Sequence, residues 1–266
     1  MVPDFVSNLF AAVVAAAIGL LWRGRACVRG AIEIGRFALG HGRRVRVSYC
    51  AVLRVREADR VCLFRSASRP EAFGPPGGVI KYRDSARAEL DRLSFADDVW
   101  PGRAAEMRRD LRGYLPARSV PGFRRWFRAG LDRESIEECL RRELGEELVE
   151  IGLGDLVPTV AGLNFIPARA VTEGPRRVPG QDYLQVRRFD VCDLSCDTAA
   201  TADFHRRLIE AGDDPRQQLV CCARVQEVNE GRCHAGLIAP HTAYLVRAKK
   251  LASDLPPIQK TTAYGP

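Results

Sequence analysis

The sequence lacks the paired cysteines and the histidine clusters that mark most structural metal sites. It has 266 residues and nine cysteines, yet no two cysteines stand at the C-x2-C spacing of a zinc site. Cys192 and Cys196 are separated by three residues, and Cys221 and Cys222 are adjacent. An odd, scattered set argues against a disulfide framework and favours reduced cytoplasmic thiols. No metal-ligand spacing relates the four histidines, which are His41, His205, His234 and His241.

A second absence is at the N-terminus, where no lysine or arginine precedes an apolar run over residues 5–22. A cleaved signal peptide needs a basic region at that place. The run is long enough to span a bilayer, which takes about 17–25 residues, and Trp22 stands where an interfacial aromatic residue belongs. We therefore expect a single transmembrane anchor over residues 1–24 and a juxtamembrane linker over residues 25–42. A buried globular helix is the alternative, since the run is rich in alanine.

The charges around this run predict its orientation. Arg23, Arg25 and Arg29 follow it at once, whereas Asp4 is the charged residue before it. Because positive charge stays on the cytoplasmic side, the short N-terminus should face outward. This predicts a single-pass protein of the inner (cell) membrane with its soluble domain in the cytoplasm.

Residues 43–266 are enough for one domain with a substantial core, and they contain no internal repeat. The net charge of +8 is uneven, because arginines crowd the segment of about residues 79–131. That segment can bind a nucleotide or oligonucleotide, or it can be a solvated helix attracted to anionic lipid. The arginines are Arg103, Arg108, Arg109, Arg112, Arg118, Arg124, Arg125 and Arg128.

Residues 134–151 predict an amphipathic helix with an apolar stripe at helical spacing. Asp132 is the expected N-cap, and Gly152 the expected stop. Glu138 and Arg142, four residues apart, are expected to pair. The stripe consists of Ile136, Leu140, Leu144 and Leu148.

Glu143, Glu146 and Glu147 are related by three and four positions, so their carboxylates share one arc of this helix. Three like charges repel unless a cation neutralises them, and hard oxygen ligands suit Mg²⁺ or Mn²⁺. Such a metal can polarise a phosphoryl oxygen while a spare carboxylate acts as general base. The alternative is a solvated acidic face.

Strand patterns precede and follow this helix. Residues 44–55 and 60–65 read as a hairpin, and residues 73–79 (FGPPGGV) form a glycine-rich turn. Downstream, we expect strands over residues 157–165, 183–191 and 219–228, helices over residues 202–211 and 241–251, and a loop over residues 175–181.

A strand pair, Pro-Gly-Gly and a helix with R-E-L-x-E-E together resemble the Nudix hydrolases, whose signature is G-x5-E-x7-R-E-U-x-E-E-x-G-U. Gly78 fits the first glycine and Glu134 the next glutamate. The core of the signature is matched by Arg142, Glu143, Leu144, Glu146 and Glu147.

The chain departs from this signature in two places. Gly78 and Glu134 are 134 − 78 = 56 positions apart instead of six, so an insertion of roughly fifty residues splits the motif. Val149 and Glu150 replace the final glycine and aliphatic residue. Neither departure removes an expected metal ligand.

The Nudix resemblance implies an α/β fold, an α/β/α sandwich with a mixed sheet preceded by the transmembrane helix. It implies a Mg²⁺ (or Mn²⁺) site at Glu143, Glu146 and Glu147, with Glu143 and Glu147 catalytic and Arg142 orienting the glutamates. Gly77, Gly78 and Arg142 are expected to contact the ligand.

The stretch F-R-R-W-F-R-A-G-L-D-R-E over residues 123–134, together with the anchor, is similar to the membrane-tethered, SMODS-associated Nudix proteins. These stand beside CD-NTases in bacterial CBASS anti-phage operons. This narrower resemblance implies an effector or sensor that binds a cyclic oligonucleotide or nucleotide, clusters as a homo-oligomer and acts on the lipid bilayer. A Mg²⁺-dependent hydrolase of nucleoside diphosphate linkages, or a tethered house-cleaning pyrophosphohydrolase without a defence role, are the alternatives.

Overall fold

The computed structural model describes residues 44–65, 70–99, 105 and 107–249 of the chain. The expected anchor and linker, residues 1–24 and 25–42, lie outside the described residues. In the described part, every helix is too short or too polar to cross a bilayer. The α/β class expected from the sequence is confirmed, but there are two mixed sheets in place of one.

The first sheet, sheet A, has β1 (Arg44–Arg54) at its centre. β9 (Leu184–Leu194) runs parallel to β1 along one edge, and β8 (Phe165–Arg177) pairs antiparallel with β9. The other edge of β1 is shared by β7 and β5, and β6 continues the sheet beyond β7. These three short strands are β5 (Gly77–Val79), β6 (Ala96–Asp97) and β7 (Arg112–Pro116).

The second sheet, sheet B, has the strand order β10-β3-β4-β12-β11, with β2 also paired to β3. Only β12 and β4 run parallel within it. Its strands are β2 (Arg56–Glu57), β3 (Arg60–Arg65), β4 (Ala72–Gly74), β10 (Val220–Arg224), β11 (Arg232–Cys233) and β12 (Gly236–Ile238).

The predicted hairpin of residues 44–55 with residues 60–65 is confirmed at its turn, where β2 pairs antiparallel with β3 around residues 58–59, but it does not extend along β1. β1 lies in sheet A and β3 in sheet B, and only the two-residue β2 pairs with β3. The reason is that both edges of β1 are already occupied, by β9 on one side and by β7 and β5 on the other. β3 therefore has no free edge of β1 with which to pair.

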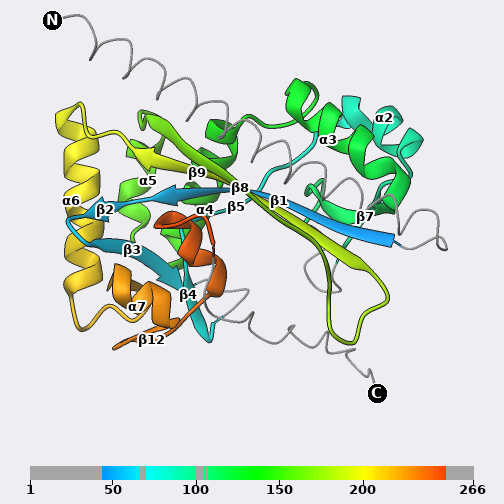
Figure 1. Ribbon diagram of the computed structural model, residues 1–266. Coiled ribbons are helices and arrows are strands. Elements are labelled where there is room, and N and C mark those ends of the chain that lie inside the picture. The colour runs from blue at the N-terminus through cyan, green and yellow to red at the C-terminus, as the bar shows by residue number, and fades with distance from the viewer. Residues whose placement is uncertain (1–43, 66–69, 100–104, 106, 250–266) are drawn as a thin grey trace, which may run out of the picture.

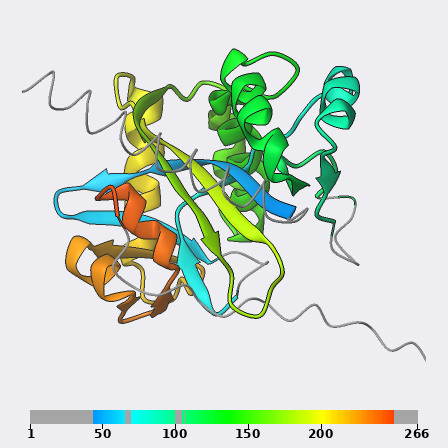
Figure 2. The same ribbon diagram turned by 45° about the vertical axis from the view of Figure 1, so that its right-hand side comes forward.

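The longer helices cover different parts of this framework (Figure 1). α4 (Ile136–Glu150) packs against β5 and β1, whereas α6 (Ala199–Asp213) packs along β10 and β3 of sheet B. α2 (Arg87–Arg92) and α3 (Val120–Ala129) lie together near β7, and Figure 2 shows the same grouping from a second direction.

Short helical segments join these elements. Within the described ranges, four of them are 3₁₀ helices: η1 (Asp84–Ala86), η2 (Ala117–Ser119), η3 (Gly154–Leu156) and η4 (Pro240–Leu245). Two are α-helices of one or two turns: α5 (Val157–Val160) and α7 (Val225–Glu230).

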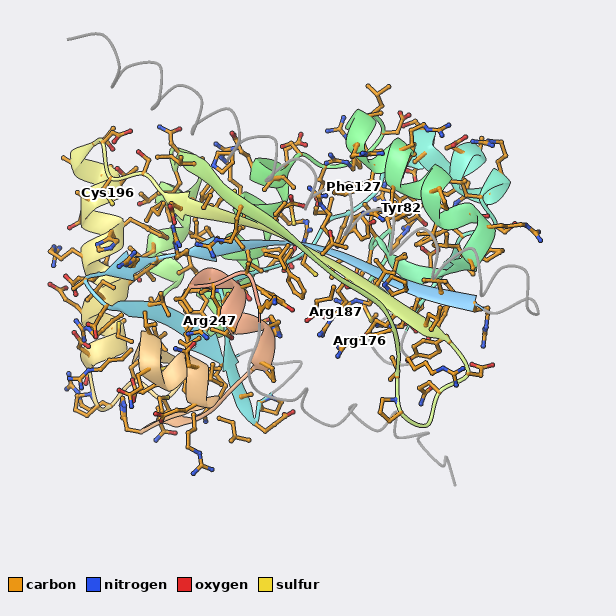
Figure 3. The ribbon with its side chains drawn as sticks, in the orientation of Figure 1. Tyr82, Phe127, Arg176, Arg187, Cys196 and Arg247 are labelled. Atoms are coloured by element: carbon orange, nitrogen blue, oxygen red, sulfur yellow. The ribbon has the colours of Figure 1, made fainter. Side chains whose placement is uncertain are left out.

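The inserted segment belongs to the core of the fold. Its strand β7 is part of sheet A, and Phe123 and Phe127 of α3 pack edge-on against Tyr49 of β1 at ring distances of 5.2 and 4.6 Å. Figure 3 labels Phe127 and Tyr82 at the end of the molecule that α2 and α3 occupy. Removal of this segment would therefore expose one face of the central strand.

Several downstream expectations need correction. Residues 157–165 are not a strand: α5 starts at Val157, with Pro158 in its first turn, and β8 begins at Phe165. Proline is favoured at this position of a helix and removes a donor from a strand. The expected loop over residues 175–181 is partly strand, since β8 continues to Arg177.

The last third of the chain is predicted better. The strand over residues 183–191 is confirmed as β9, and the helix over residues 202–211 as the middle of α6. Residues 219–228 divide into β10 and α7, because the Arg224 backbone is bonded by Glu227 at the start of a new helix. Residues 241–251 hold the short η4 rather than an α-helix, and the residues from 250 onward lie outside the described part.

Candidate functional site

The glutamate helix α4 starts at Ile136, two residues later than the sequence predicted. Its N-cap is Ser135, whose hydroxyl accepts the backbone N–H of Glu138 while the Glu138 carboxylate accepts the backbone N–H of Ser135. The Asp132 cap is therefore wrong, because a reciprocal capping box stands three residues further on. Leu144 and Leu148 are fully buried, which fixes the face that the helix turns to the core.

Glu138 does not pair with Arg142. It contacts Arg83 at 2.9 Å in addition to closing the capping box. The Glu138 carboxylate is thus held at the first turn of the helix, where an anion is favoured by the helix dipole. Arg142 is free to take other partners.

Arg142 is bound by Glu134 through two parallel hydrogen bonds of 2.8 and 2.9 Å. Its third nitrogen donates to Glu143 at 2.7 Å, and one of the two nitrogens bound to Glu134 also donates to the Val79 carbonyl at 2.9 Å. Burial alone would lower the pKa of Arg142, but bonds from Glu134 and Glu143 raise it above its usual value. This guanidinium therefore connects the glutamate before the helix, the first glutamate of the trio and strand β5.

The insertion leaves the motif intact because its two ends are bonded to each other. Lys81 N–H donates to the Glu134 carboxylate at 2.9 Å, Glu134 N–H donates to the Lys81 carbonyl at 2.9 Å, and Arg83 N–H donates to the Asp132 carbonyl at 2.8 Å. If residues 84–133 are passed over, Glu134 follows Gly78 with the five-residue spacing of the signature. The inserted segment of fifty residues therefore begins and ends at neighbouring positions beside the site.

Glu143 lies directly over Gly78. A β-carbon on Gly78 would overlap the Glu143 carboxylate, so glycine at this position of β5 leaves the space that the carboxylate fills. Burial raises the pKa of Glu143, and the Arg142 guanidinium opposes that shift. The site thus holds a partly desolvated carboxylate against backbone.

Glu147 is bound to the other glycine. Gly77 donates its backbone N–H to the Glu147 carboxylate at 2.8 Å. Gly77 has φ +114°, and a side chain there would overlap the Ala51 carbonyl, so this position requires glycine. Burial raises the pKa of Glu147 well above its usual range, the Gly77 N–H opposes this, and the charge of Glu143 adds to it.

Glu146 differs from the other two glutamates. Its side chain is 56 % exposed and lies 3.7 Å from Arg142. The helix therefore offers two carboxylates anchored on the Pro-Gly-Gly strand and a third at the solvent side.

The three glutamates match a hard cation in donor chemistry. The raised pKa values of Glu143 and Glu147 record both burial and mutual repulsion, which a divalent cation would relieve. As the side chains stand, no three acidic, cysteine or histidine groups in the described part are gathered tightly enough to hold a metal. Glu146 is the exposed member of the three, so its side chain would have to turn inward to complete such a site.

Sequence reasoning missed Asp110. It comes from the insertion just before β7, is 7 % exposed, and forms an isolated antiparallel bridge with Lys81 next to β5. Burial raises its pKa to about 7, although the charges of Arg112 and Lys81 oppose the shift. No signal in the sequence marked it, because one aspartate among arginines has no periodicity or motif.

Comparison with known families agrees with this geometry. The family model described as the SMODS-associated NUDIX domain matches residues 44–246. Neither the curated proteins nor the solved structures contain a match to the chain. The matched span runs from the first residue of β1 to just beyond η4 and includes the insertion, so the chain belongs to the SMODS-associated Nudix domain family.

Proposed function

We propose that this protein is a nucleotide-recognising Nudix protein of a bacterial CBASS anti-phage system, with a functional link to a CD-NTase. Its ligand is the cyclic oligonucleotide or nucleotide that such an enzyme makes. The observation that carries the proposal is the bidentate Arg142–Glu134 pair, which rejoins a signature interrupted by fifty residues. The family match over residues 44–246 supports the link to nucleotide signalling.

Glu143, Glu146 and Glu147 would hold Mg²⁺ or Mn²⁺ in this site. The bound metal would supply charge neutralisation for a diphosphate and polarise a phosphoryl oxygen. The chain's own groups then have separate tasks: Arg142 fixes Glu143 against Gly78, and the Gly77 N–H fixes Glu147. Both carboxylates are held in place before any ligand arrives.

Hydrolysis of a nucleoside diphosphate linkage is the second candidate. It is favoured by the raised pKa of Glu147, because a general base works best when its pKa lies nearer to neutral pH. In this case Glu147 would accept a proton from water, and Arg142 would keep Glu143 oriented. A house-cleaning pyrophosphohydrolase without a defence role would use the same groups.

The membrane tether is part of the proposal. The apolar run of residues 5–22, followed by three arginines, supports a single anchor in the inner membrane with the Nudix domain in the cytoplasm. Ligand-driven clustering of several copies would then bring their anchors together in the bilayer.

Thermal melting of the full-length protein in detergent tests recognition. Cyclic dinucleotides and trinucleotides, with Mg²⁺, should raise the melting temperature, since a ligand that binds only the folded state stabilises it. Glu147→Gln should weaken the effect, because an amide is a poor Mg²⁺ ligand. The control is Glu150→Gln, on the same helix and exposed. Absence of any shift in the wild-type protein would refute the proposal.

Product analysis on the same samples separates recognition from hydrolysis. If nucleoside diphosphate derivatives are cleaved in Mg²⁺ and Glu147→Gln stops the cleavage, the protein is an enzyme. A melting shift without product formation identifies a receptor.

A further inference from the structure

One face of sheet A carries polar and charged side chains across its central strands. The odd-numbered residues 45–53 of β1 all lie in the main core. Because side chains alternate along a strand, Arg46, Ser48 and Cys50 must point to the opposite face. We call this side the polar face of sheet A.

Two arginines flank Ser48 on the polar face. Ser48 is paired with Arg112 of β7 on one side and with Arg187 of β9 on the other. Residues directly opposite each other in a sheet point to the same side. Arg112, Ser48 and Arg187 therefore form one row across three strands.

The glutamate site lies on the other face of sheet A, because Glu143 fills the side-chain position of Gly78 and Gly78 is paired with Ala51 of the core face. The two faces are still close enough for their charges to act on the same groups. The positive charge of Arg112 and the negative charge of Glu143 both act on Cys50, and both also act on Asp110. The Ser48 hydroxyl lies 3.6 Å from the Cys50 sulfur.

The two arginines differ in their partners. Arg187 is bound to the buried Glu173 at 2.5 Å, and Glu173 also accepts the Tyr244 hydroxyl and lies 3.6 Å from Arg176. Figure 3 shows Arg176 and Arg187 along the same stretch of β8 and β9. Arg187 is therefore positioned and largely neutralised.

Arg112 is not neutralised in this way. Its side chain is half-buried, and across the described ranges of the chain it forms no hydrogen bond or ion pair. Its nitrogens are not among the buried polar atoms without a partner, so they are open to solvent, and a bound anion can take the hydrogen bonds that water makes with them. The inserted segment thus presents to the polar face a guanidinium that acts on Asp110 through its charge but has its hydrogen-bond donors open.

We propose that Arg112 binds a phosphate group of the ligand over Ser48, between β7 and β9 on the polar face of sheet A. A guanidinium can donate two parallel hydrogen bonds to a phosphate, and the Ser48 hydroxyl can donate another. This role rests on the proposed function in that the phosphate belongs to a nucleotide. It gives the insertion a direct part in ligand recognition.

The next row along β1 suits the rest of a nucleotide. Tyr114 is paired with Arg46, and its ring contacts that of Tyr183 at 5.4 Å. Two residues along a strand span about 7 Å, so this aromatic pair lies one row away from the phosphate position. Aromatic rings offer stacking surfaces to nucleobases.

Calorimetric titration of the full-length protein with sodium pyrophosphate, in EDTA and without Mg²⁺, tests the anion site alone. Arg112→Ala should weaken binding roughly 10- to 100-fold, and Arg112→Lys should weaken it less, since it keeps the charge but loses the fork. The matched control is Arg125→Ala, an exposed arginine of the same insertion on α3, which should bind as the wild type does. The melting temperature without ligand should be unchanged in Arg112→Ala.

Equal affinity of Arg112→Ala and Arg125→Ala, or no pyrophosphate binding by the wild-type protein at millimolar concentration, overturns the assignment. Repeating the titration with a cyclic dinucleotide and Mg²⁺ separates this inference from the proposed function. If Glu147→Gln weakens nucleotide binding and Arg112→Ala does not, the phosphate role fails and the proposed function stands. If pyrophosphate binding depends on Arg112 but no nucleotide binds, the anion site stands and the proposed function fails.

Discussion

Two glycines on β5 determine where the glutamates of α4 can lie. Gly78 leaves the space that the Glu143 carboxylate fills, and Gly77 turns its N–H toward Glu147 with a backbone conformation that disfavours a side chain. The absence of side chains at these two positions of β5 therefore helps to position the carboxylates of α4. The position of the two carboxylates depends on contacts between β5 and α4, whose contacting residues are 65 or more positions apart in the chain. The periodicity of α4 alone carries no information about such contacts.

The variant Gly78→Ala tests this positioning of Glu143, because it adds a single carbon atom to β5. The added methyl group should displace the Glu143 carboxylate and break its 2.7 Å bond to Arg142, lowering the free energy of unfolding by about 1–3 kcal/mol. Urea unfolding followed by tryptophan fluorescence measures the change.

Gly145→Ala is the control for that variant. A β-carbon at Gly145 meets no atom within 4 Å, and the residue lies inside α4. Alanine there should stabilise the helix by about 0.5–1 kcal/mol. A stabilising Gly78→Ala, or a destabilising Gly145→Ala, would contradict the geometry described for the site.

Glu147 predicts a pH dependence of stability. Its pKa in the folded protein is raised above the ordinary value of 4.5, mainly by burial. The folded state therefore binds the proton more tightly, and stability is lost as the pH rises from that value through the folded pKa. Glu147→Gln removes this loss while its amide oxygen can still accept the Gly77 N–H.

Melting temperatures of Glu147→Gln and wild type in EDTA, from pH 4 to pH 9, measure the effect. The variant should be the more stable protein at neutral pH, and the difference should vanish toward pH 4. A difference that is constant with pH, or that grows on acidification, would rule out a raised pKa.

At the scale of elements, the sequence predicts those whose signal is local and repetitive. The apolar stripe of α4 identified a helix, and α6 and β9 were found in the same way. The start of α4 was misplaced because Asp132 and Ser135 are both good capping residues, and only Ser135 has a glutamate three positions later within the helix. Asp132 instead has φ +59° and accepts a bond from Ser85.

Ser135→Ala should cost about 1 kcal/mol of stability, since it removes the capping hydroxyl of α4. Asp132→Asn, which tolerates the same backbone conformation, should change stability much less. Urea unfolding of both variants compares the two positions. No loss of stability in Ser135→Ala would contradict the cap at Ser135.

Sheet pairing could not be predicted from local patterns. β1 and β3 are neighbours in the chain and both alternate, so a hairpin was the natural expectation. In the fold, β1 takes β9 as a parallel partner, and this pairing joins Val45 to Leu184. Neither strand alone contains a sequence signal for a partner so far away in the chain. This pairing places β1 in a different sheet from β3.

At the scale of the whole molecule, the insertion is a component of the fold and of the candidate site. It supplies β7 to sheet A, Phe123 and Phe127 to the core, and Asp110 to the neighbourhood of Glu143. The motif residues could be recognised from the sequence because their types are retained. The way their halves meet could not, because it depends on backbone bonds between Lys81 and Glu134.

Deletion of residues 84–133, with Arg83 joined to Glu134, restores the signature spacing and tests this description. The shortened chain should fail to fold, because the core then loses the Phe123 and Phe127 side chains and β1 loses β7. Solubility and circular dichroism measure the outcome. A shortened chain that folds as stably as the full chain would show that the insertion is an appendage.

The central claim is that a signature divided by fifty residues is reassembled into a nucleotide site. Calorimetric titration of the full-length protein and of Glu147→Gln, in Mg²⁺, with the purified product of a CD-NTase reaction tests this most directly. The wild-type protein should bind the product, and Glu147→Gln should bind at least about tenfold more weakly. Equal affinity of the two proteins, or no binding by either, would contradict the claim.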